Sequence, residues 1–153
     1  MPLRVDYDLT SIRMSRADMT DRPPTLWRYR EVLPLGAGDE TSLAEGFTPL
    51  LPVEHNVWVR DEARNPTGSF KARGMALAVS MAKALGARAL AAPSAGNAAG
   101  ALAAYGACAG LPVTVAMPDD TPKPFFDECR HYGVRRNRPS SERYDRGRRQ
   151  VPA

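Results

Sequence analysis

The sequence predicts an α/β protein whose parallel sheet is covered by helices on both faces. Between residues 68 and 117, helical periods alternate with short apolar runs that lack polar alternation, as strands buried on both sides do. Gly86 and Gly133 close two of these helical periods, in the position that helix ends favour. With 153 residues, 43% hydrophobic and 25% charged, the chain suits one ordinary globular domain.

The N-terminal part of the chain is predicted to form one short helix and two short strands. Residues 1–21 are polar and weakly patterned, and we expect them to be weakly structured. The segment "RPPTLWRYREVL" then predicts a short helix that Asp21 can cap and that Trp27 can anchor to the body. The segments "TPLLPV" and "VWVRDEA" are rich in Val, Leu and Trp, with turn residues between them, and predict two strands.

Three helices and two strands follow in alternation. In "SFKARGMALAVSMAKALG" apolar or small residues recur at steps of three and four, which predicts one apolar helix face. This face consists of Phe70, Gly74, Leu77, Met81 and Leu85. "RALAAP" and "LPVTVAMP" predict buried strands, and "SAGNAAGALAAYGACAG" and "DTPKPFFDECRHYG" predict the helices that follow them. The alternation is typical of a parallel sheet with right-handed crossovers.

Residues 134–153 break this pattern and hold the excess positive charge. They contain seven arginines against Glu142 and Asp145, whereas the rest of the chain has a net charge of −1. The rest of the chain therefore lacks the excess positive charge that is typical of nucleic-acid-binding proteins. We divide the chain into an N-terminal segment (1–21), an α/β domain (22–133) and an arginine-rich tail (134–153) that we expect to be disordered. An RNA-binding tail is the alternative.

The composition argues against a membrane-spanning, secreted or metal-binding protein. No run approaches the roughly 18 uncharged apolar residues of a membrane span, and the N-terminus offers no signal-peptide core. Cys108 and Cys129 are too few for a disulfide framework, so we expect a cytoplasmic protein. His55 and His131 have no partner at metal-ligand spacing, and we expect no metal site.

The turn "NPTGSFK" is the first of two candidate chemical sites. Asn-Pro and Thr-Gly are turn dipeptides, and Thr67 or Ser69 can cap the helix that follows. Lys71 then falls in the first helical turn, where the helix dipole and burial against Phe70 both disfavour its charged form. A neutral, positioned amine is the nucleophile that a Schiff base with an aldehyde such as pyridoxal phosphate requires. The alternative is a surface lysine that extends into solvent.

The turn "PSAGNAAG" is the second candidate site. Small residues between a buried strand and a helix expose several N–H groups at the positive end of the helix dipole, which suits a carboxylate or a phosphate. The side-chain amide of Asn97 can cap the helix or donate to an oxygen of a bound ligand. A tight turn that lets a small-residue helix pack closely on the sheet is the alternative. Neither turn contains a nucleotide-binding motif.

The two turns together carry a resemblance to a known family. "TPL", "NPTGSFKARG" and "PSAGNAAGALAAYGA", in this order, are similar to the fold-type-II pyridoxal-phosphate-dependent enzymes of the tryptophan synthase β superfamily, and most closely to threonine synthases. The resemblance implies that Lys71 forms the internal aldimine with the cofactor and that Asn97 hydrogen-bonds the cofactor's 3-hydroxyl. It also implies a loop that holds the substrate carboxylate, made of Ser94, Ala95, Gly96, Asn97 and Ala98.

The same resemblance implies a reaction. It is the lyase step of threonine biosynthesis, in which O-phosphohomoserine and water give threonine and phosphate. The expected partner is a small amino-acid substrate, and a homo-oligomer is possible. Threonine dehydratase and cysteine synthase carry the same lysine with different flanks, so they remain alternatives, as does a catalytically dead remnant. "NPTGSF" and the alanine-rich "GNAAGALAAYGA" favour threonine synthase.

Two departures from the family pattern bear on the expected reaction and on the cofactor site. Threonine synthases commonly have Lys-Asp-Arg where this chain has Lys71-Ala72-Arg73. The resemblance also implies a glycine-rich loop for the cofactor phosphate and a polar partner for the ring nitrogen, and neither motif is found. We therefore expect the fold to be incomplete at its C-terminal end, with the resemblance ending at Gly133. A shifted reading frame after Gly133 is our hypothesis for the arginine-rich tail.

Overall fold

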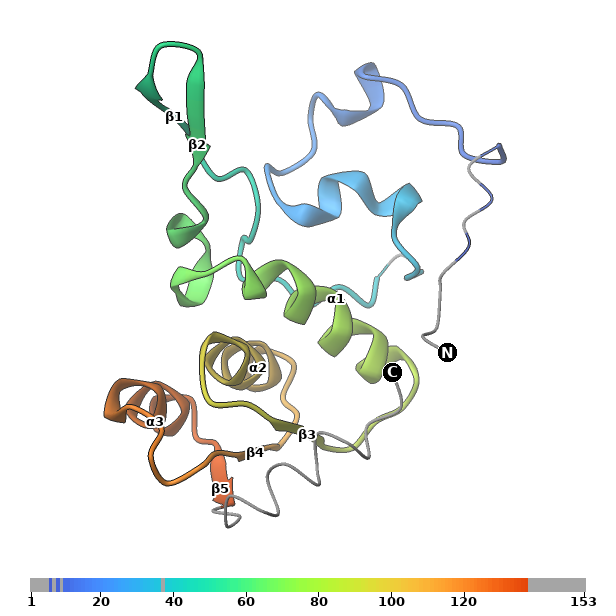
Figure 1. Cartoon of the computed structure of the whole chain (residues 1–153). Helices are drawn as coiled ribbons and strands as arrows, with labels where there is room; N and C mark the ends of the chain where they lie inside the picture. The colour runs from blue at the N-terminus through green and yellow to red at the C-terminus, as the bar shows by residue number, and fades with distance from the viewer. Residues whose placement is uncertain (1–5, 7, 9, 37, 138–153) are drawn as a thin grey trace.

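The computed structural model describes residues 6, 8, 10–36 and 38–137, and its elements alternate between helix and strand in the second half (Figure 1). In the first half, four short 3₁₀ helices flank a pair of strands. The elements in chain order are η1 (Ala17–Met19), η2 (Leu26–Val32), β1 (Leu50–Glu54), β2 (Val57–Arg60), η3 (Glu62–Arg64), η4 (Pro66–Gly68), α1 (Lys71–Ala84), β3 (Leu90–Pro93), α2 (Asn97–Cys108), β4 (Val113–Ala116), α3 (Lys123–His131) and β5 (Arg135–Asn137).

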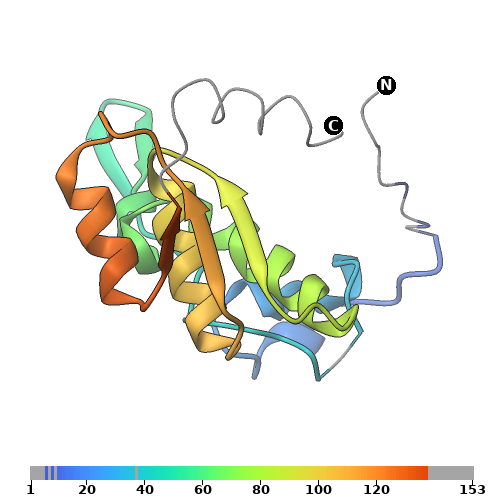
Figure 2. The ribbon, with the colours of Figure 1, turned by 90° about the horizontal axis from the view of Figure 1, so that it is seen from below.

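Strands β3, β4 and β5 form a parallel sheet in that order, which confirms the predicted fold class. Both connections, through α2 and α3, step in the same direction along the sheet, so right-handed crossovers place both helices on one face. Figures 1 and 2 show α1, α2 and α3 on this side of the strands. We predicted helices on both faces, but in the described part of the chain no helix lies on the other face.

Helix α2 lies at the centre of the core. All of its residues from 99 to 106 are buried, because α1 packs on one side of it and the sheet on the other. Along β4 the alternate residues Val113 and Val115 are buried, and Met117 continues the same register just beyond the strand. The apolar side of the sheet and the small residues of α2 thus form one continuous core.

The buried face of α1 differs from the predicted one. Its buried residues are Ala72, Ala76, Val79 and Ser80. Phe70 and Leu85, which we placed on the apolar face, are 56% and 80% exposed. The predicted face was wrong because the partner helix α2 is built from alanine and glycine. Two such helices approach closely, so the residues at their contact are small and the large apolar side chains are left at its edges.

A short strand follows the third helix. Residues 135–137 pair with β4 as β5, so the sheet continues past Gly133 into the stretch that we assigned to the tail. Gly133 itself has a φ of +76°, as expected for the residue that ends α3. The predictions of disorder and of RNA binding concern mainly residues 138–153, which lie outside the described residues.

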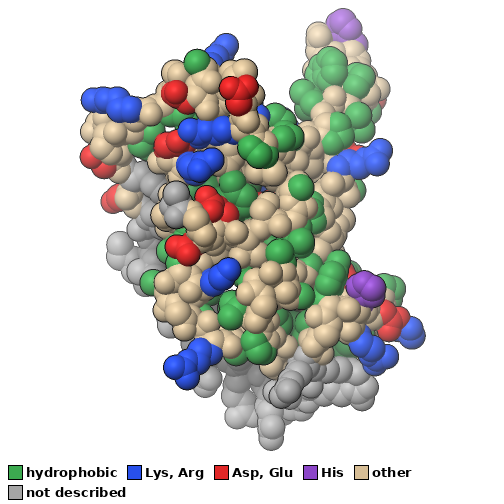
Figure 3. Space-filling model, turned by 180° about the vertical axis from the view of Figure 1, so that it is seen from behind, with side chains coloured by type: hydrophobic (Ala, Val, Ile, Leu, Met, Phe, Trp, Pro, Cys, Tyr) green, Lys and Arg blue, Asp and Glu red, His purple; other side chains and the backbone are tan. Residues whose placement is uncertain are grey.

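The N-terminal elements agree with the prediction in position. The expected short helix is present as η2, of the 3₁₀ type, and Trp27 is 7% exposed and belongs to the core. The expected strands β1 and β2 pair antiparallel as a hairpin that projects from the body (Figures 1 and 3). Its large apolar side chains are all 44–60% exposed; they are Leu50, Leu51, Val53, Val57, Trp58 and Val59.

Neither a membrane-spanning helix nor a metal-binding cluster is present in the described residues. Among them, no helix combines the length and the apolar character that crossing a membrane requires. Likewise, no group of three or more His, Cys, Asp or Glu side chains in this part of the chain is placed to hold a metal ion.

Candidate active site

Lys71 is the first residue of α1, as the sequence predicts. No acidic side chain lies in this first turn, and Lys71 is partly buried. Its Nζ atom lies 4.2 Å from the centroid of the Phe70 ring. The Phe70 ring is 56% exposed, and its π face attracts a positively charged amine. The role of Lys71 as a nucleophile stays a prediction.

The turn before Lys71 holds two hydroxyl groups without partners. We predicted that Thr67 or Ser69 caps α1, but the residue before the helix is Phe70 and no side chain caps it. Ser69 lies in extended backbone one position too early, and Thr67 adopts a left-handed conformation with φ of 62°. Both hydroxyl oxygens are buried with no hydrogen-bond partner in the described structure. A buried polar group left unpaired costs about 1–3 kcal/mol, so these hydroxyls are available to a polar ligand.

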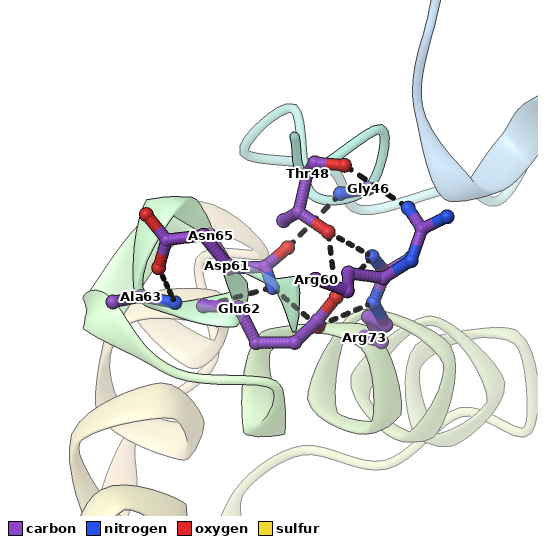
Figure 4. Close-up of polar contacts among 8 residues, drawn as sticks. All are labelled: Gly46, Thr48, Arg60, Asp61, Glu62, Ala63, Asn65 and Arg73. Carbon is purple, nitrogen blue, oxygen red and sulfur yellow. Dashed lines mark hydrogen bonds and ion pairs between the residues drawn. The ribbon is translucent and has the colours of Figure 1, made fainter. Parts of the chain in front are cut away.

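Glu62 holds this turn in place through a partly buried network (Figure 4). Its carboxylate accepts hydrogen bonds at 2.8 Å from both Nε and Nη2 of Arg73, in α1. The Thr48 hydroxyl donates to the same carboxylate at 2.6 Å, and the Asn65 amide donates at 2.7 Å. The Arg73 bonds, more than any other contact, lower the pKa of Glu62 to about 2. One carboxylate therefore joins the helix that begins at Lys71 to two other segments of the chain.

Asn65 extends the network to the loop before β1. Its side chain is 4% exposed, and its Oδ1 accepts a hydrogen bond at 3.1 Å from the backbone N–H of Gly46. We interpreted Asn65 only as a turn residue, and we assigned no role to Thr48, Glu62 or Arg73. The sequence signal was faint, because Glu62 and Arg73 stand eleven positions apart and share no helical or strand period.

The second candidate loop lies where the sequence predicts, between β3 and α2. Strand β3 ends at Pro93 and α2 begins at Asn97, with Gly96 as the residue before the helix. The Ser94 hydroxyl lies 3.4 Å from the backbone N–H of Gly96, which donates to it, and Asn97 is exposed. The predicted carboxylate loop of residues 94–98 is therefore a strand-to-helix turn with no side-chain cap on α2. Its role in binding is untested.

The fold brings the two candidate loops to the same part of the molecule. The η4 turn, just before Lys71, packs against α2. Figure 2 shows α2 and α3 beginning at the edge where β3 and β4 end. A side chain at Gly96 would reach Phe125, near the start of α3, at 4.0 Å. This edge is where α/β folds place their ligands.

A buried carboxylate that the sequence did not reveal ties the N-terminal loop to α2. Glu45 is fully buried, and its carboxylate accepts a hydrogen bond at 2.7 Å from the hydroxyl of Tyr105. The backbone N–H of Leu43 donates to the same oxygen at 3.0 Å. Burial raises the pKa of Tyr105 above its ordinary value, so the phenol keeps its proton and remains a donor.

Comparison with known proteins gives these residues a family context. The chain matches the family model described as "Pyridoxal-phosphate dependent enzyme" over residues 41–149. It is 39% identical to a threonine synthase of Methanosarcina acetivorans over 76% of this chain, and 45% identical to a threonine synthase of Halalkalibacterium halodurans over 61% of it. The chain spans 30% and 29% of the length of these two curated relatives.

Solved structures with a similar fold belong to other enzymes. A pyridoxal 5'-phosphate-dependent aspartate racemase matches with a TM-score of 0.55 and 29% identity, over 60% of this chain and 29% of that one. O-ureido-L-serine synthase matches with a TM-score of 0.54 and 26% identity, over 62% of this chain and 33% of that one. The family match extends beyond Gly133, so the break that we expected at this residue is not seen in that comparison.

Proposed function

The chain belongs to the family of pyridoxal-phosphate-dependent enzymes, and from that membership we propose a lyase reaction of the threonine synthase type. In this reaction O-phosphohomoserine and water give threonine and phosphate. The relatives named threonine synthase, at 39% and 45% identity, support the choice of reaction. The observation that carries the proposal is the placement of Lys71 at the start of α1, beside two buried hydroxyls without partners.

The described residues fit pyridoxal phosphate where they can be tested. The Lys71 amine is the group that an aldehyde cofactor requires, and the unpaired hydroxyls of Thr67 and Ser69 fit a polar ligand beside it. We assign the Asn97 amide to the cofactor's ring hydroxyl and the loop of residues 94–98 to the substrate carboxylate. When bound, the cofactor supplies an electron sink for the negative charge that forms on the substrate.

The proposed roles of this chain's own residues are binding and proton transfer. Lys71 would hold the cofactor through its side-chain amine, and the same amine, when free, would take the proton from the substrate Cα. The backbone N–H groups at the start of α2 hold the substrate carboxylate, which fixes the orientation of that carbon relative to Lys71. Glu62 keeps Lys71 in position by anchoring Arg73 two residues further along α1.

Covalent trapping of the cofactor tests the assignment of Lys71. The purified chain is mixed with pyridoxal phosphate, reduced with borohydride and digested, and the modified peptide is identified by mass spectrometry. We expect the modification on Lys71, together with a visible absorbance that Lys71→Ala lacks. Lys83→Ala is the matched control, because Lys83 is an exposed lysine in the last turn of the same helix. Equal modification of the wild type and Lys71→Ala would refute the assignment.

The three candidate reactions, those of threonine synthase, threonine dehydratase and cysteine synthase, are distinguished by which substrate the chain converts. Ala72, where threonine synthases commonly have Asp, is fully buried against α2, so this position reports on helix packing. The departure from Asp at this position weakens the assignment of the substrate more than that of the cofactor. O-phosphohomoserine, threonine and O-acetylserine with sulfide, offered separately, distinguish threonine synthase, threonine dehydratase and cysteine synthase by their products. Turnover of threonine or O-acetylserine alone would overturn the proposed reaction, and trapping at Lys71 without turnover would favour the remnant.

A further inference from the structure

A pocket lies between α1 and elements that precede it in the chain, and it has no role in the proposed reaction. Its volume is about 280 Å³, and it is formed by η2, the loop of residues 46–48, the end of β2 and α1. Its polar lining consists of Thr25, Tyr29, Thr48, Arg60 and Arg73, and none of its lining residues is acidic. Residues two apart on a helix project about 200° from each other, so Arg73 and Lys71 lie on opposite sides of α1.

Two guanidinium groups meet at Thr48 in this pocket (Figure 4). Nη1 of Arg60 donates to the Thr48 carbonyl at 3.0 Å, and Nη2 of Arg73 donates to the Thr48 hydroxyl at 3.0 Å. Arg73 is paired with the carboxylate of Glu62, which raises the pKa of Arg73, and the charge of the buried Glu45 acts in the same direction. Among the described residues, Arg60 has no carboxylate at ion-pair distance. Two adjacent cations in a partly enclosed space repel each other, and an anion between them would relieve the repulsion.

A third guanidinium contacts one of the residues that line the pocket. The guanidinium of Arg28 lies 5.1 Å from the centroid of the Phe47 ring, which lines the pocket. Phe47 adopts a left-handed backbone conformation with φ of 47°, which is rare for an aromatic residue. Thr25, the residue that precedes η2, and Tyr29, within η2, also line the pocket. Arginines with hydroxyl groups are the side chains that recognise phosphate oxygens.

We propose that this pocket binds a small phosphate-bearing anion between Arg60 and Arg73, at a site separate from Lys71. The hydrogen bonds described above use Nη1 of Arg60 and Nε and Nη2 of Arg73. The remaining guanidinium nitrogens can donate to phosphate oxygens; they are Nε and Nη2 of Arg60 and Nη1 of Arg73. The Tyr29 hydroxyl donates a further hydrogen bond from η2. The phosphate can be a free ion or the end group of a phosphate ester, because both present the same oxygens. The site does not depend on pyridoxal phosphate or on the proposed reaction.

Calorimetric titration of the full chain tests the proposal. Inorganic phosphate is added at constant ionic strength, with chloride replaced in step, and we expect saturable binding with one phosphate per chain. Arg60→Gln removes one charge and its donors, and we expect the dissociation constant to rise about tenfold or more. The control Arg88→Gln removes an exposed arginine elsewhere, and we expect it to bind phosphate like the wild type.

Further titrations test whether the phosphate site is distinct from Lys71 and whether its ligand is free phosphate or a phosphate ester. Lys71→Ala should bind phosphate as the wild type does, whereas a loss of binding in this variant would overturn the proposal. O-phosphoserine binding more tightly than inorganic phosphate indicates an ester ligand, and the reverse order indicates the free ion. Equal binding of acetate, or unchanged binding in Arg60→Gln, would also overturn it. If Arg60→Gln does not fold, Tyr29→Phe is the test variant, with an expected severalfold loss and the same refuting result.

Discussion

Replacing Glu62 by glutamine should make the stability of the protein less dependent on acid. In the folded chain the pKa of Glu62 is lowered from 4.5 to about 2, chiefly by the hydrogen bonds from Arg73. A difference of this size corresponds to at most about 3 kcal/mol of folding free energy. The Glu62 side chain is 27% exposed, and screening by solvent reduces the expected contribution to about 2 kcal/mol.

The sign of the effect follows from proton binding. Between pH 4.5 and about 2 the unfolded chain binds a proton at Glu62 that the folded chain does not, so stability rises with pH in this window. The contribution is therefore fully present at neutral pH and is lost as the pH falls towards 2. Glu62→Gln should be about 2 kcal/mol less stable than the wild type at pH 7, and the difference should shrink below pH 4.5.

Urea denaturation followed by circular dichroism measures this difference at several pH values. Other acids titrate in the same range, so the informative quantity is the difference in unfolding free energy between the wild type and Glu62→Gln. Glu54→Gln is the matched control, because Glu54 is a glutamate that lies exposed at the end of β1. A difference between the wild type and Glu62→Gln that stayed constant from pH 7 to pH 2.5 would refute the reasoning.

Two further predictions, one on helix packing and one on a buried hydrogen bond, are each measured by thermal unfolding. A Cβ at Gly106 would lie 2.2 Å from Cγ2 of Val113, so Gly106→Ala should create a clash. Alanine favours the helix more than glycine does, and after this gain is subtracted the variant should still be about 1–2 kcal/mol less stable than the wild-type protein. Gly74→Ala, with no atom within 4 Å of the new Cβ, should instead stabilise it by about 0.5–1 kcal/mol, and the same sign for both would contradict the packing. Tyr105→Phe leaves the buried Glu45 without one donor and should cost about 1–3 kcal/mol, whereas Tyr132→Phe, at a partly exposed site, should cost little. If Tyr105→Phe is as stable as the wild type, the other hydrogen-bond donors are sufficient to stabilise the buried carboxylate of Glu45.

The sequence was informative where a local signal decided the structure. The start of α1 at Lys71 and the turn before Asn97 follow from turn dipeptides and small residues, which act over a few positions. The parallel order of β3 and β4 follows from the alternation of helix and strand, with a crossover between them. These features place both candidate loops correctly without any knowledge of tertiary contacts.

The remaining features depend on contacts between distant segments. The buried face of α1 is determined by the small residues of α2, and no period within α1 itself reports on its partner. Glu45 and Tyr105 are sixty positions apart, and only the folded chain joins them. Strand β5 contains consecutive arginines that no propensity assigns to a sheet, and it forms because β4 offers an open edge beside it.

The apolar hairpin of β1 and β2 has a consequence for how this chain behaves in concentrated solution. Two strands alone are marginally stable in water, and this pair exposes valine, leucine and tryptophan. In the described part of the chain, no third strand pairs with either edge of the hairpin. Such an edge is a template for another extended chain, so association should rise with protein concentration even though the body of the molecule is well packed. The titrations and unfolding experiments described above therefore belong at the lowest concentrations that their signals allow.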